Sequence, residues 1–181
     1  MKNLTIISTI ILSILLTGCA GIEKKTDCKI SVMGITADDF RGRDWRVVAL
    51  GVGTSFLVHE ASHIIYAEMN DGGHFDWDRR VCIMEDYHNQ SHSDQQMFHR
   101  AGFLGQLAVG GILTAIPTTR HADFTLGFNT FTTINTGIYT ITGGRDDECS
   151  DIRQLDNGKT EGSIYTFGAG VLTYINLDKA D

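Results

Sequence analysis

The residues best suited to chemistry stand in one short run, His59-Glu60-Ala61-Ser62-His63. On a helix, residues four apart lie on one face, so His59 and His63 can present two imidazole nitrogens to a single metal ion. Glu60 lies about 100° round the helix, where it can reach a water on that ion without binding the ion itself. The spacing predicts a helical zinc site with a general base beside it.

Hydrolysis is the chemistry that such a site supports. Zn²⁺ lowers the pKa of a coordinated water towards neutrality, and a glutamate can take the proton as the water attacks a carbonyl. The run resembles the motif shared by the zincin metallopeptidases. That resemblance implies a zinc metallopeptidase that cleaves a peptide or protein substrate, with His59 and His63 as zinc ligands and Glu60 as the catalytic residue.

A catalytic zinc also needs a third protein ligand and an open position. The metzincin extension of the motif is absent, because Tyr66 and Met69 replace its glycine and histidine. The run from Thr142 to Ile152 is similar to the segment that supplies an aspartate ligand in peptidases of the membrane-anchored AAA protease family. This similarity implies Asp151 as the third ligand, with Asp147 or another histidine as the alternative.

Other polar residues are expected to play smaller parts. His99 is placed to support the site from behind or to stabilise an oxyanion, and Tyr66 is suited to either part. Arg100 and Gln106 are interpreted as packing or surface residues. The histidines of the polar stretch 74–92 are expected to be solvated.

Helices must carry these residues. Asp44 is suited to cap a helix that runs to about residue 69, with the motif inside it. Residues 70–92 lack periodicity and predict an irregular loop. A second helix is expected from Ser93, with Gln96 in the capping-box position, to just before Pro117. Further helices are predicted at about 122–142, 147–155 and 161–177.

These elements predict an all-α, mainly helical fold, a compact bundle of about four main helices with the motif on the first. The 181 residues are enough for one domain with a core. The net charge is −7 and no basic run is present, so nucleic acid is not expected as a partner.

The amino terminus has the features of a secretion signal. Lys2 precedes an apolar stretch, Leu4 to Leu16, that is too short to span a bilayer. The following Leu16-Thr17-Gly18-Cys19 resembles the lipobox of bacterial lipoproteins. The resemblance implies removal of residues 1–18 as a signal peptide, acylation of Cys19 with chains such as palmitate, and attachment to the membrane through that lipid.

The same resemblance implies a place in the bacterial cell envelope. Ala20 is not an acidic inner-membrane retention signal, which favours the outer membrane, facing the periplasm or the cell surface. Residues 19–37 are then a tether, and residues 38–181 form the helical metallopeptidase-like domain. In an oxidising compartment, two of the three remaining cysteines can form a disulfide, and three pairings are open: they are Cys28, Cys82 and Cys149.

Two alternatives stay open. Site-2-type intramembrane proteases also carry His-Glu-x-x-His and a later aspartate, and residues 101–119 and 124–144 lack charge over about the width of a bilayer. Against this, the second stretch is rich in Thr and Asn, and only residues 47–58 are uncharged before His59. The other alternative is an envelope lipoprotein that binds zinc without catalysis, for which Glu60 would have no use.

Overall fold

The structure is a computed structural model that describes residues 31–32, 35–36, 40–70, 72–76, 81–142 and 151–177. The chain divides into two compact units, Met1–Arg43 and Asp44–Asp181. In the first unit, strand β1 (Ser31–Val32) pairs antiparallel with β2 (Ile35–Thr36). The predicted signal peptide and lipidated Cys19 lie outside the described residues.

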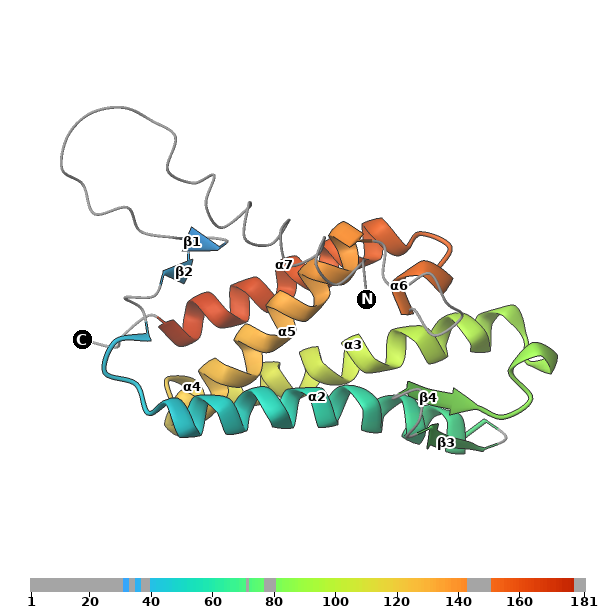
Figure 1. Ribbon diagram of the computed structural model, residues 1–181, viewed down its shortest axis with the longest axis horizontal. Coiled ribbons are helices and arrows are strands. Elements are labelled where there is room, and N and C mark those ends of the chain that lie inside the picture. The colour runs from blue at the N-terminus through green and yellow to red at the C-terminus, as the bar shows by residue number, and fades with distance from the viewer. Residues whose placement is uncertain are drawn as a thin grey trace, which may run out of the picture. The chain divides into compact units, whose positions relative to one another are not determined.

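Four long helices form the second unit. They are α2 (Trp45–Glu68), α3 (His92–Ala115), α5 (Asp123–Thr142) and α7 (Gly158–Leu177). Helix α2 packs against α3 and α5, while α7 packs against α5 and α3 (Figure 1). The predicted mainly helical bundle of four main helices is confirmed.

Successive main helices run in opposite directions (Figure 1). The short helix α4 (Pro117–Arg120) links α3 to α5. At that end of the bundle, the backbone N–H of Asp44 donates to Asp123 Oδ2 at 2.7 Å, and Asn176 Nδ2 donates to the carbonyl of Arg120 at 2.7 Å. We call this the Trp45 end, because α2 and α5 begin here and α3 and α7 end here.

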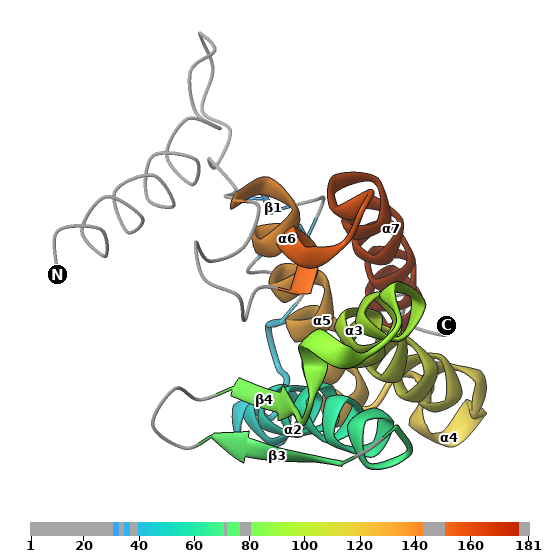
Figure 2. The ribbon, with the colours of Figure 1, turned by 90° about the vertical axis from the view of Figure 1, so that its right-hand side faces the viewer.

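The opposite end carries a small hairpin where an irregular loop was expected. Strands β3 (Gly73–Asp76) and β4 (Val81–Met84) pair antiparallel and lie against α2 (Figure 2). A 3₁₀ turn, η3 (Tyr87–Asn89), follows. Met84 is buried with Ala67 and Phe98, so tertiary packing holds a segment whose sequence has no strand periodicity. We call this the hairpin end.

The start of α3 also differs from the sequence prediction. The N-cap is Ser91, whose hydroxyl accepts from the backbone N–H of Asp94, so the predicted capping box of Ser93 and Gln96 is wrong. Gln96 instead ties α3 to α6 (Asp151–Gln154): its amide donates to the carbonyl of Gln154 at 2.7 Å and its oxygen accepts from Asp156 N. This tie fixes α6 at the hairpin end.

Candidate metal centre

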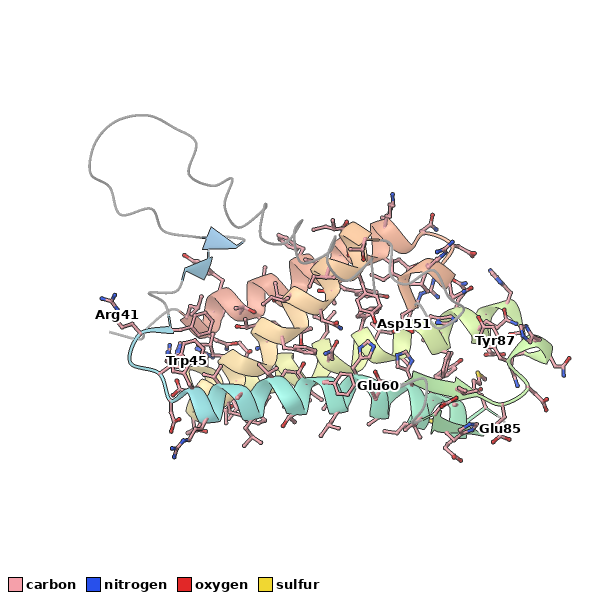
Figure 3. All side chains as sticks on the ribbon, viewed as in Figure 1. Arg41, Trp45, Glu60, Glu85, Tyr87 and Asp151 are labelled. Atoms are coloured by element: carbon pink, nitrogen blue, oxygen red, sulfur yellow. The ribbon has the colours of Figure 1, made fainter. Side chains whose placement is uncertain are left out.

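The structure brings His59, His63 and Asp151 together. His59 and His63 lie four residues apart on α2, with their ring nitrogens near the carboxylate of Asp151. Asp151 is the first residue of α6 and lies across from α2 (Figure 3). Asp151 Oδ2 lies 3.0 Å from His59 Nε2 and 3.2 Å from His63 Nε2, and the two Nε2 atoms are 3.3 Å apart. All three residues are buried. The alternative ligand, Asp147, lies outside the described residues.

The ring proton of His59 is fixed by Gln106. Gln106 Nε2 donates to the carbonyl of Ser55 at 3.1 Å and to its hydroxyl at 2.9 Å, so the amide nitrogen points away from the cluster. The amide oxygen therefore faces His59 Nδ1 at 3.0 Å and accepts from it. With its proton on Nδ1, neutral His59 presents Nε2 as an acceptor.

The same holds for His63. Its Nδ1 lies 2.7 Å from the backbone carbonyl of Phe98, which can only accept, so Nδ1 carries the proton. In the neutral rings, two bare Nε2 atoms and a carboxylate oxygen then face one another at 3.0 to 3.3 Å. Three acceptors this close repel unless a cation lies between them. The donor set, two imidazoles and one carboxylate, is one that zinc prefers.

The second oxygen of Asp151 is held by another histidine. His99 Nδ1 donates to Asp151 Oδ1 at 3.3 Å, and the hydroxyl of Tyr87 donates to His99 Nε2 at 2.9 Å. His99 thus supports the cluster from behind, one of the two parts predicted for it. Tyr66 does not, because its hydroxyl bonds to Asp94.

Charge and hydrogen bonds keep Asp151 ionised. Burial by itself raises the pKa of this carboxyl. When the rings also carry a proton on Nε2, as they can without a metal ion, the charge of His63 and the hydrogen bonds from His59, His63 and His99 outweigh that effect. Together they hold the pKa of Asp151 well below its usual range. A carboxylate that stays ionised is the form that binds a metal ion.

Helix α3 leaves room for the cluster at a glycine. A Cβ on Gly102 would collide with His63 Nε2 and His59 Cε1, so no larger residue fits there without displacing the imidazoles. Two aromatic rings complete the apolar wall: Phe103 lies edge-on to His59 with ring centroids 5.0 Å apart, and Phe98 lies 5.1 Å from His63. Aromatic rings therefore line the cluster beside its hydrogen-bonding partners.

Glu60 is half-buried on α2 beside this cluster (Figure 3). Its charge acts electrostatically on His63, the second histidine of the motif. It contributes no atom to the His59–His63–Asp151 group. Glu60 is therefore adjacent to the cluster without being one of its three members.

Gln106 is the residue near the cluster that the sequence interpretation missed. It was expected to pack or to lie at the surface, yet its buried side chain orients His59. The available signal was the spacing of His99, Gly102 and Gln106, which places all three on one face of α3. Arg100, on another face, forms a two-bond ion pair with Glu161 at 2.7 and 2.8 Å.

The fold and the site define a mainly helical protein with a buried His59–His63–Asp151 cluster that can hold a metal ion. Comparisons with models of protein families, with curated proteins and with solved structures found no match. The function of the cluster must therefore be inferred from its own chemistry.

Proposed function

We propose that His59, His63 and Asp151 hold a zinc ion and that the protein hydrolyses peptide bonds at the bacterial cell envelope, with Glu60 as general base. The observation that carries the proposal is the convergence of three acceptor atoms, His59 Nε2, His63 Nε2 and Asp151 Oδ2. The two neutral rings carry their protons on Nδ1, where other groups accept them. In a purely structural histidine pair, a ring N–H would donate to the neighbouring acceptor. Here neither neutral ring has an N–H that points at the other ring or at Asp151.

The support around the cluster is that of a metal site. Metal-binding histidines almost always donate their second ring N–H to a carbonyl or carboxylate, which fixes the tautomer and the ring orientation. His59 does so to Gln106 and His63 to the carbonyl of Phe98. Three protein ligands are the number found in catalytic zinc sites, which keep a position open for water or substrate.

The chemistry divides between the ion and the chain. Zinc, when bound, supplies a Lewis acid that polarises a carbonyl and acidifies water. Glu60 accepts the proton of the attacking water and passes it to the leaving amine, as its position next to His59 in the motif allows. His99 and Gln106 act only through the ligands that they hold, so they are positioning residues.

The location rests on the amino terminus. The lipobox-like Leu16-Thr17-Gly18-Cys19 supports a lipid-anchored chain in the envelope. Such a chain has peptide or protein substrates in the same compartment. Neither attachment nor substrate is needed for the metal test below.

Metal content of the full-length chain, purified in detergent and measured by elemental analysis, tests the site. We expect about one zinc per chain, lost in His63→Ala and in Asp151→Ala. The matched controls are His74→Ala and Asp156→Ala, whose side chains are 58% and 59% exposed and which should keep the metal. A folded wild-type chain that takes up no zinc, even when the metal is supplied, would overturn the proposal.

Glu60→Gln tests catalysis separately. This change keeps the size of the side chain and removes the base, so zinc content should stay and cleavage of a mixed peptide library, read by mass spectrometry, should fall about 100-fold or more. Equal cleavage by wild type and Glu60→Gln would contradict the assigned role. Zinc without any cleavage in the wild type would instead indicate a zinc-holding lipoprotein.

A further inference from the structure

The outer surface of the helical bundle is apolar on all four main helices. Within residues 47–65, 101–117, 124–141 and 164–177, every residue classed as exposed is apolar, Tyr174 adding one hydroxyl. The large ones include Leu57 (64% exposed), Ile112 (61%), Ile141 (78%) and Phe167 (73%). A water-soluble helix carries charged and polar residues along its outer face, whereas these stretches carry none, and the exposed polar residues of the four helices lie near the helix ends.

The interior is polar where a soluble bundle is apolar. Most of the largest fully buried side chains are amides or hydroxyls: Ser55, Gln106, Thr125, Asn129, Thr132, Thr133, Thr136, Thr173 and Asn176. Many hydroxyls bond to the carbonyl four residues earlier in their own helix, as Thr132, Thr136 and Thr173 do. Small residues and such hydrogen bonds, not apolar side chains, hold helices together in a membrane.

The lengths of the four helices and the positions of their charged residues also fit a lipid bilayer. The helices of 24 and 20 residues are about 36 and 30 Å long, against about 30 Å of hydrocarbon in a bilayer. Arg46, Arg120 and Asp123 lie at the Trp45 end, while Asp94, Asp156 and Lys159 lie at the hairpin end. Exposed Trp45 marks one boundary, as interfacial tryptophans do (Figure 3).

Hydropathy alone identifies one such helix in the described part of the chain. Only α2 is long and apolar enough there to cross a membrane by length and composition, and 28% of its most apolar window is buried, so it is not a core helix. The Thr, Asn and Gly residues that lower the hydropathy of α5 are largely those facing inward. The Thr and Asn residues of α5, which argued against a membrane-spanning segment in the sequence, therefore lie mostly inside the bundle.

We propose that α2, α3, α5 and α7 are embedded in a lipid bilayer, with hydrocarbon covering their apolar outer faces. A second protein copy would cover one face, whereas exposed apolar residues lie on every main helix. His59 follows Trp45 by 14 residues, about 21 Å of helix, so the metal cluster lies within the hydrocarbon thickness, nearer the hairpin end. Ionisable residues in that position face the bundle interior and pair with one another, as this cluster does.

Cysteine labelling in membranes tests the embedding without reference to metal or activity. Cys28, Cys82 and Cys149 are changed to Ser, Cys19 is kept, and single cysteines are placed by Leu57→Cys, Ile112→Cys or Phe167→Cys. Open membrane fragments are then treated with a charged maleimide. The controls are Asp156→Cys, at a side chain 59% exposed, and Lys159→Cys, two turns before Phe167 on α7.

We expect the three mid-bundle cysteines to react about ten-fold or more slowly than the controls, because each unit by which an apolar medium raises a thiol's pKa cuts the thiolate fraction about ten-fold. All positions should react alike after denaturation in sodium dodecyl sulfate. Equal rates in the membrane fragments would overturn the proposal. Protection at one position with rapid reaction at the other two would also overturn it and point to a protein partner on that helix.

Discussion

Two buried polar clusters lie in opposite halves of the same bundle and distribute their protons differently. Towards the Trp45 end, Asn129 Nδ2 donates to Thr114 Oγ1 at 3.0 Å and to Asn176 Oδ1 at 2.6 Å. Asn176 Nδ2 donates to the carbonyl of Arg120, and Thr114 donates to the carbonyl of Gly110. Among the side-chain atoms of Thr114, Asn129 and Asn176, only Asn129 Oδ1 lacks a hydrogen-bond donor, and it lies close against Gly110.

In the His59–His63–Asp151 cluster the donors point outward and the acceptors inward. His59, His63 and His99 give their Nδ1 protons to Gln106, Phe98 and Asp151. When the rings are neutral, no residue that the structure describes donates into the centre between the Nε2 atoms and Asp151 Oδ2. A buried polar cluster is thus structural when nearly all of its acceptors are met by donors. It is a ligand site when acceptors converge without a donor.

The contrast between the two clusters can be tested by substitution, and the largest loss of zinc affinity is expected from Gly102→Ala. The added methyl group would collide with both imidazoles, so zinc affinity should fall about 100-fold or more. The matched control on the same helix is Gly111→Ala, because a Cβ there meets nothing within 4 Å. Competition with a fluorescent zinc chelator measures both. Unchanged affinity in Gly102→Ala would mean that the ion does not sit between these imidazoles.

A smaller loss is expected from Gln106→Leu. Without the amide oxygen, the Nδ1 proton of His59 has no acceptor and the ring is no longer oriented, so zinc affinity should fall about 10- to 100-fold. Asn129→Leu removes a buried amide from the other cluster and serves as its control. It should lower the thermal unfolding midpoint while zinc affinity stays the same. If both variants weaken zinc binding equally, the two clusters are not independent.

The smallest effect is expected from removing a balanced pair. Thr133 and Thr173 share a hydrogen bond of 2.9 Å, and each hydroxyl also reaches a carbonyl of its own helix. Thr133→Val combined with Thr173→Val takes away both partners at similar volume, so stability should change by less than about 1 kcal/mol. The thermal midpoint in detergent checks this, with zinc content as a second reading. A large loss would show that hydroxyls, not shape, hold α5 to α7.

The sequence predicted the parts of the site that depend on local spacing. Asp44 as a cap and the four-residue spacing of His59 and His63 indicated α2 and its ligand face, and the structure places both as expected. Asp151 was reached through a local resemblance. Gln106 was not, because its role depends on contacts with Ser55 and His59, 51 and 47 residues away.

The sequence did not indicate which way the helices face. The Thr-rich α5 is helical although β-branched residues favour strands, and the buried hydroxyls of Thr132, Thr133 and Thr136 find their acceptors within that helix. The strands β3 and β4 were missed since packing on α2, not periodicity, holds them. The amino-acid composition of a helix gives the number of its polar residues, but only the fold shows which of them are buried.

The position of Asp151 also sets when the cluster can form during synthesis. Asp151 follows His59 by 92 residues and His63 by 88. A chain grows from its amino terminus, so a nascent chain that ends after α5 holds both histidines and Gln106 but lacks the carboxylate. The cluster is complete only after 151 of the 181 residues have been made, so any shorter nascent chain lacks one of its three candidate ligands.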